Sequence, residues 1–174
     1  NKLSQSEIEK ILKFFGDEKK ANLISKKIIS NRKNKIIKTE DLVHIINLVK
    51  RKKFSKIHNA TKSFQALRVF VNKEISELIF GLINSFKILP VGGMILIVTF
   101  NSLEDKIVKY FFKNYSNINN TSRYLPVNTI KNKLFKLIEN KPIFPSKEEI
   151  KINPQSRSAK LRYALKIDKE SNFS

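Results

Sequence analysis

The chain has 174 residues and a formal net charge of +20, from 35 Lys and Arg against 15 Asp and Glu. Because 41% of its residues are hydrophobic, including 13 Phe, it can build a core and is not expected to be disordered. The absence of Cys and the presence of only two His exclude disulfides, thiolate metal sites and a His-rich metal or catalytic cluster.

The positive charge favours a polyanionic partner, which can be nucleic acid, an anionic membrane or an acidic protein. Only six of the basic residues are Arg, however, and Lys, Asn and Ile are all abundant. This composition is also typical of AT-rich coding, so the charge alone leaves both explanations open.

Helical spacing of apolar residues predicts three helices within residues 1–50. Ser4 and Glu7 form the pattern of a capping box, and Gly16 is expected to end the first helix. Asp17 and Thr39 are the expected caps of the second and third helices. We therefore expect an all-helical domain over residues 1–55 and a second domain over 56–174.

A long helix is predicted from 63 to 89, followed by a turn and the apolar run 94–100. Seven apolar residues are too few to span a bilayer, and they suit a strand buried on both faces of a parallel sheet. Ser102, with Asp105 three residues later, is expected to cap the next helix.

The rest of the chain predicts a flexible loop over 114–133, a short strand over 134–138, a short helix capped by Ser146 and a last strand over 161–167. The whole order is that of an α/β fold. It resembles the end of a doubly wound sheet that closes with an antiparallel edge strand.

Ligands of open α/β sheets bind beyond the carboxyl ends of the strands. Asn101, Ser102, Glu104 and Asp105 follow the apolar strand directly and are the candidate catalytic residues. The alternative is that Ser102 and Asp105 only cap a helix and that Glu104 faces water.

Two further segments combine cationic, amide and hydroxyl side chains that suit phosphate contacts. They could instead be an ordinary basic loop and a solubilising terminal strand. The candidate RNA-binding residues are His58, Lys62, Gln65 and Arg68 in the first segment, and Arg157, Ser158, Lys160 and Arg162 in the second.

Three ordered blocks resemble signatures of the bacterial small-subunit ribosomal RNA cytosine N(4)-methyltransferases. The first is His58-x-Ala60-Thr61-Lys62-x-Phe64-Gln65-Ala66-Leu67-Arg68, continued by Val71-Asn72-x-Glu74. The second is Gly92-Gly93 before the strand, with Ser102-Leu103-Glu104-Asp105-x-Ile107-Val108-Lys109 after it. The third runs from Lys141-Pro142-Ile143 through Asn153-Pro154 to Ser156-Arg157-Ser158-Ala159-Lys160-Leu161-Arg162.

The resemblance implies a Rossmann-like sheet with an inserted helical domain. It also implies methylation of the exocyclic amine of one cytidine by S-adenosylmethionine, with small-subunit ribosomal RNA or the assembling subunit as partner. A cytoplasmic location follows from the same resemblance, and neither a membrane nor a metal is expected to take part. Asn101 stands where the family usually has His, and its amide can orient an amine but cannot accept a proton near neutral pH.

The family's glycine-rich cofactor loop has no counterpart among the four Gly of this chain. We therefore expect the chain, which begins with Asn, to be the C-terminal part of such an enzyme and to bind the cofactor weakly or not at all. The alternatives are a non-enzymatic RNA- or ribosome-binding module from a truncated or split gene, and a basic protein that docks on an anionic membrane.

Overall fold

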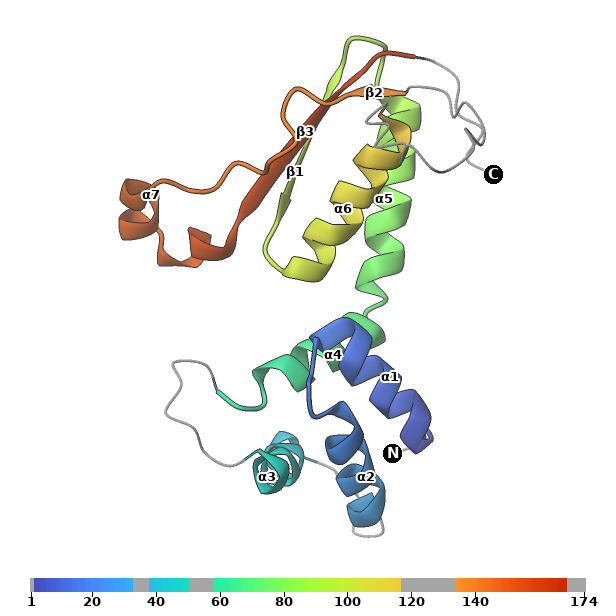
Figure 1. Ribbon diagram of the computed structural model, residues 1–174, viewed down its shortest axis with the longest axis vertical. Coiled ribbons are helices and arrows are strands. Elements are labelled where there is room, and N and C mark those ends of the chain that lie inside the picture. The colour runs from blue at the N-terminus through green and yellow to red at the C-terminus, as the bar shows by residue number, and fades with distance from the viewer. Residues whose placement is uncertain (1, 33–37, 51–57, 117–133, 169–174) are drawn as a thin grey trace, which may run out of the picture. The chain divides into compact units, whose positions relative to one another are not determined.

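The computed structural model describes residues 2–32, 38–50, 58–116 and 134–168 (Figure 1). The expected domain boundary at 55/56 and most of the predicted 114–133 loop lie outside these residues. The chain divides into two compact units, residues 1–75 and 76–174. None of the described helices is long and apolar enough to cross a membrane.

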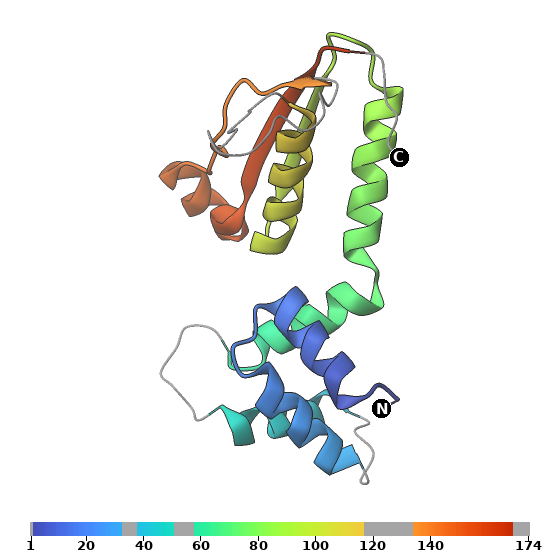
Figure 2. The same cartoon turned by 45° about the vertical axis from the view of Figure 1, so that its right-hand side comes forward.

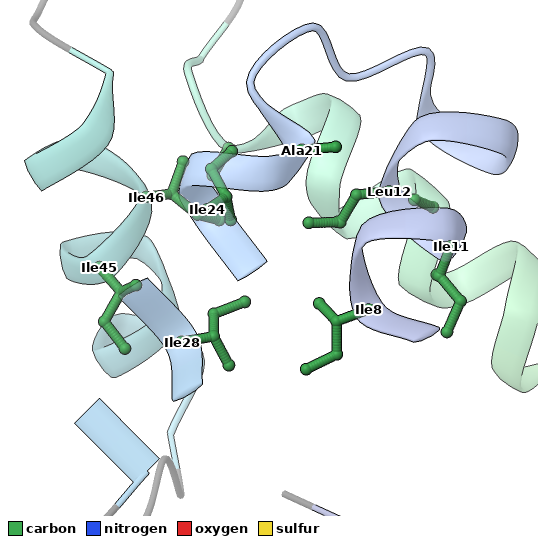
Figure 3. Close-up of a cluster of buried hydrophobic side chains, with 10 residues drawn as sticks. Ile8, Ile11, Leu12, Ala21, Ile24, Ile28, Ile45 and Ile46 are labelled. Atoms are coloured by element: carbon green, nitrogen blue, oxygen red, sulfur yellow. The ribbon is translucent and has the colours of Figure 1, made fainter. Parts of the chain in front are cut away.

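The first unit contains the three helices predicted within residues 1–50 and a fourth. They are α1 (Gln5–Gly16), α2 (Ala21–Asn31), α3 (Thr39–Val49) and α4 (Thr61–Val71). Their inward faces meet in one apolar cluster, which Figure 3 shows. The cluster includes Ile8, Ile11, Leu12, Ala21, Ile24, Ile28, Ile45 and Ile46.

Capping at the start of α1 is as predicted, but the caps of the next two helices are not. The Ser4 side chain accepts from the Glu7 N–H, and Glu7 in turn accepts from the Ser4 N–H at 2.7 Å. Asp17 does not cap α2, because it adopts a left-handed conformation (φ 47°) that closes α1. Lys20 and Lys38 occupy the N-cap positions of α2 and α3, and Thr39 is the first residue of α3.

A buried carboxylate joins three segments of this unit. Glu18, which is 4% exposed, accepts from Lys50 at the end of α3 and from the Ser63 hydroxyl in α4 at 3.3 Å. The Lys50 ammonium also donates to the backbone oxygen of Asn59 at 2.6 Å. This network fixes the start of α4 against the turn between α1 and α2.

The predicted helix from 63 to 89 is two helices, α4 and α5 (Glu74–Ile88). Lys73 breaks it with a φ of 53°, and the Asn72 N–H closes α4 on Arg68 and Phe70 oxygens. The apolar spacing continues across this break, which is why a single helix was expected from the sequence.

The second unit holds a three-stranded sheet of β1 (Met94–Thr99), β2 (Phe135–Lys136) and β3 (Lys160–Lys166), in the order β1-β3-β2. Both outer strands are antiparallel to β3 and therefore parallel to each other. The last strand was expected at an edge of the sheet, but within the described residues it lies between the other two.

Helices cover one face of the sheet (Figures 1 and 2). Phe86 of α5 and Phe112 of α6 (Ser102–Tyr115) both pack on Phe135 of β2, with ring centroids 5.1 and 5.4 Å apart. Residues Ile95 and Ala164 of β1 and β3 complete this core. The expectation that the apolar strand is buried on both faces is wrong for the described chain, since Leu96 and Val98 are more than half exposed.

The connection from β2 to β3 contains α7 (Lys147–Ile152) and the 3-10 helix η2 (Pro154–Ser158). Ser146 caps α7 as predicted, accepting from the Glu149 N–H at 3.1 Å. Asn153 then accepts from Gln155 and starts η2, which leads directly into β3.

Candidate functional site

Asn101 joins the end of β1 to the start of α6. Its side-chain oxygen accepts from the N–H groups of Leu103 (3.0 Å) and Glu104 (2.8 Å), and Oε2 of Glu104 accepts from the Phe100 and Asn101 N–H groups. The capping box therefore uses Asn101 and Glu104, not the expected Ser102 and Asp105. Ser102 is exposed as the first residue of α6.

Asp105 lies one residue further along α6 and points to β3. It accepts from Arg162 Nε at 2.7 Å and from Lys160 Nζ at 3.3 Å, and Arg162 Nη1 also donates to the backbone oxygen of Asn140. Burial by itself raises the pKa of Asp105, but the hydrogen bonds and positive charges of Arg162 and Lys160 outweigh it. The net pKa of Asp105 lies below its ordinary value, so this carboxylate is held ionised.

The structure brings the candidate catalytic segment and the second predicted RNA-binding segment together. Thr99 at the end of β1 pairs with Lys160 at the start of β3, and its hydroxyl donates to the Lys160 oxygen at 3.4 Å. Arg157 and Ser158 are exposed on η2, immediately before β3. Arg162 differs from them, because it is only 9% exposed and its guanidinium is held by Asp105 and Asn140.

The other predicted RNA-binding residues belong to the first unit, at and after the start of α4. His58 and Lys62 are exposed, and Lys62 Nζ donates to the Asp17 backbone oxygen at 3.2 Å. Gln65 is half-buried. Arg68 forms two hydrogen bonds to Glu74, at 2.8 and 3.1 Å, while its side chain stays 59% exposed.

The residues present do not form a glycine-rich cofactor loop. Gly92 (φ 85°) and Gly93 form the turn before β1, where the Gly92 N–H donates to the Lys166 oxygen. Gly16 is packed against α4, and Gly81 lies in open space on α5. Among the described residues there is also no group of three or more side chains with metal-ligand chemistry.

Several residues that order this region were missed by sequence reasoning. Lys166 is 5% exposed and donates to the backbone oxygens of Phe86 and Leu89 at the end of α5. The Thr99 hydroxyl donates to the backbone oxygen of Lys160 in β3, and the backbone oxygen of Asn140 accepts from the Arg162 guanidinium. Their partners lie 22 to 80 residues away in sequence, so local spacing carries no signal for them.

Beside the Asp105–Arg162 pair lies a hollow of about 250 Å³. Lys109 and Lys113, one helical turn apart on α6, line it together with Arg162, Asn140 and the acidic Glu139. A second hollow, of about 480 Å³ between α5 and α6, is mainly apolar.

Comparison with known protein families identifies the chain as a member of a methylase family. The MraW methylase family matches residues 1–167, and the chain belongs to that family.

Similar proteins carry the name ribosomal RNA small subunit methyltransferase H. The relative from Ehrlichia chaffeensis is 44% identical over 96% of this chain and 54% of its own length. Relatives from Bartonella henselae and Caldicellulosiruptor saccharolyticus are each 41% identical, over 99% and 96% of this chain. The chain spans about half the length of these curated relatives.

Proposed function

We propose that this chain is the C-terminal part of an S-adenosylmethionine-dependent enzyme that methylates the exocyclic amine of a cytidine in small-subunit ribosomal RNA, in the cytoplasm. The observation that carries the proposal is the junction of Asn101–Asp105 with Lys160 and Arg162, two segments 57 residues apart that meet at the carboxyl end of β1. The names of the relatives support the ribosomal RNA substrate.

The exocyclic amine of cytosine is a poor nucleophile, because its lone pair is delocalised into the ring. Acceptors must hold its hydrogens so that the nitrogen is aimed, and a base must finally take one proton. Asn101 Oδ1 already accepts from two backbone N–H groups. We therefore assign its side-chain NH₂ the role of a hydrogen-bond donor to the cytosine ring. Glu104 uses Oε2 in the capping box, and we assign Oε1 and the exposed Ser102 hydroxyl as acceptors of the amine hydrogens.

Asp105 is a positioning residue in this proposal. A carboxylate whose pKa is lowered by two cations is a weak base, so its part is to tie α6 to β3. Glu104 is the better candidate for the proton acceptor, since no Lys or Arg of the described residues forms an ion pair with it.

We assign the RNA contacts to four cations. Arg157 on η2 and Lys62 and Arg68 on α4 are exposed, and Lys160 at the start of β3 is half-buried. His58, Gln65 and Ser158 lie near them in sequence and complete the contact set. Arg162 is assigned to the Asp105 pair and not to the RNA. The cofactor needs residues beyond the described chain, because no glycine-rich loop is formed here.

The test is methylation by a chimera in which this chain replaces the matching half of the Ehrlichia chaffeensis relative. With undermethylated small subunits and labelled S-adenosylmethionine, we expect one N4-methylated cytidine by mass spectrometry. Glu104→Gln and Ser102→Ala should each lower the rate by about 100-fold, the scale of one acid–base or positioning group. The matched control Glu148→Gln, on exposed α7, should leave the rate unchanged.

The second candidate is a non-enzymatic RNA-binding module, favoured by the +20 charge and the missing cofactor loop. It predicts RNA binding that weakens steeply with salt, and no methylation by the chimera. Methylation of a cytidine amine by the chimera would support the methyltransferase and exclude the non-enzymatic RNA-binding module.

A further inference from the structure

The exposed side of α6 presents three lysines and a tyrosine. Lys106, Lys109, Tyr110 and Lys113 are spaced by three or four residues, so they lie along one face of the helix. We call this surface the α6 ridge. All four side chains are exposed, and Tyr110 reaches 69% although it is a large aromatic residue. None of these lysines forms an ion pair with another described residue, so their charges are available to a partner.

A hollow lies on each side of the α6 ridge. On one side, Lys106 and Tyr110 line the apolar hollow of about 480 Å³ between α5 and α6, a volume in the range of small-ligand sites. On the other side, Lys109 and Lys113 line the hollow of about 250 Å³ beside Arg162. The ridge therefore separates a surface that suits an apolar ring from a surface that suits an anion.

The apolar hollow has the lining of a nucleobase site. Tyr110 contributes an aromatic ring, and Ile79 and Ile83 of α5 contribute aliphatic surface opposite α6. The side-chain amide of Asn114 also lines the hollow and can both donate to and accept from the polar edge of a base. An unpaired base offers a flat face for stacking and a polar edge for hydrogen bonds, so it matches this lining.

The smaller hollow suits the phosphates of the same strand. The charge of Arg162 is already balanced by Asp105, which leaves Lys109 and Lys113 against the carboxylate of Glu139. The two lysines outweigh that carboxylate, so the lining stays net positive. Lysines attract phosphate and release its bound counterions, which gives RNA binding its dependence on salt.

We propose that the α6 ridge and its two hollows bind an unpaired stretch of RNA, with one base stacked on Tyr110 in the apolar hollow and neighbouring phosphates on Lys109 and Lys113. The site adds residues of α6 to the RNA contacts already assigned on α4, η2 and β3. This inference deepens the proposed function and rests on it, because the RNA is taken to be the substrate of that enzyme.

An anionic membrane is the other polyanion to weigh against RNA. Helices that lie on a membrane insert a broad apolar face between the lipids. The α6 ridge instead places three lysines around a single aromatic ring. Alternating cations and aromatic rings are typical of proteins that bind single strands, so the ridge favours RNA.

The first experiment measures the affinity of the chain for a fluorescent single-stranded oligouridine by anisotropy. Tyr110→Ala should raise Kd about tenfold, as expected for the loss of one stacked base, and Tyr110→Phe should keep the parent Kd because it retains the ring. The matched control is Phe14→Ala on α1, where Phe14 is 67% exposed, and it should leave Kd unchanged. A fully paired RNA hairpin should not respond to Tyr110→Ala, since its bases are already stacked.

The second experiment tests the charges of the ridge. Lys109→Gln combined with Lys113→Gln should reduce the slope of log K against log salt by about 1.4, for two phosphate contacts of about 0.7 each. The control, Lys10→Gln combined with Lys13→Gln, removes the same charge from exposed positions of α1 and should leave the slope unchanged.

Three results would overturn the proposal. The first is no binding of oligouridine by the parent chain, and the second is an equal loss of affinity for the α6 variants and their α1 controls. The third is binding to phosphatidylserine vesicles that Tyr110→Ala weakens while the affinity for oligouridine stays unchanged, because the ridge would then be a membrane contact.

RNA binding and methylation are measured separately. A Kd that depends on Tyr110, in a chain whose chimera does not methylate, leaves the RNA site in place and contradicts the proposed function. An unchanged Kd for Tyr110→Ala, together with methylation by the chimera, contradicts only the RNA site on α6.

Discussion

Arg162 in β3 donates from Nε to Oδ1 of Asp105 in α6 across 2.7 Å, and both side chains are nearly buried. The pair links the first turn of the helix after β1 to the strand that follows η2. It brings two motifs that are far apart in sequence into contact, so a substitution of Asp105 is expected to lower stability.

Asp105→Asn should lower the free energy of unfolding by about 3 kcal/mol, because it leaves the buried Arg162 guanidinium without a compensating charge. Chemical denaturation monitored by circular dichroism measures this. The matched change Glu148→Gln, on an exposed carboxylate, should stay within about 0.5 kcal/mol. Equal effects at the two positions would contradict a stabilising role for the pair.

The same pair predicts a dependence on acid. The pKa of Asp105 is lower in the folded chain than its ordinary value of 3.8, so its contribution is complete above that value and is lost as the pH falls through the folded pKa. The difference in unfolding free energy between the parent chain and Asp105→Asn should therefore be constant from about pH 7 to 5 and shrink below about pH 4. A difference in unfolding free energy that grows as the pH falls would contradict a lowered pKa of Asp105 in the folded chain.

Two glycines in helices should respond oppositely to alanine. A Cβ on Gly16 would lie 2.5 Å from the Lys62 backbone oxygen, so Gly16→Ala should cost about 2 kcal/mol. A Cβ on Gly81 meets nothing within 4 Å, and Gly81→Ala should stabilise α5 by about 0.5–1 kcal/mol. Thermal unfolding of both variants measures this, and an unchanged stability of Gly16→Ala would refute the close approach of α1 and α4.

Replacing Lys73 with glycine should stabilise the protein, whereas replacing it with alanine should not. Its φ of 53° lies in the left-handed region, which is costly for a residue with a Cβ. We expect Lys73→Gly to raise the unfolding free energy by about 1 kcal/mol and Lys73→Ala to bring no gain. The same result for both variants would argue against the break between α4 and α5.

Arg157 should contribute to RNA affinity through its charge. Arg157→Gln should weaken binding of a single-stranded small-subunit RNA fragment and reduce the slope of log K against log salt by about 0.7, the value for one phosphate contact. Lys87→Gln, an exposed cation at the end of α5 outside the motifs, serves as the control. An unchanged slope for Arg157→Gln would remove this residue from the contact surface.

Local signals in the sequence predicted much of the secondary structure. The Ser4–Glu7 box, the apolar run that becomes β1 and the cap at Ser146 depend on neighbouring residues, and each is observed. The cap of α6 was expected at Ser102, and it is Asn101, one residue earlier. Asn and Ser cap helices about equally well, so the sequence alone did not distinguish the two neighbouring positions.

The long-range pairings could not be predicted in the same way. Lys50 is the partner of the buried Glu18, which lies 32 residues earlier, and local spacing gives no signal of this contact. The position of β3 in the middle of the sheet follows from its pairing with both β1 and β2. Such contacts depend on the folded topology and leave no periodic pattern in the chain.

The pairing of β1 with β3 extends over six residue pairs, and the Gly92 N–H bond to Lys166 closes one end of the ladder. A deletion of one residue within either strand would shift the register, exchange the two faces and separate Thr99 from Lys160. Insertions between β2 and α7, by contrast, leave every one of these pairs in place and cost little chain entropy. Natural length variation among relatives should therefore accumulate in that connection and spare the two strands.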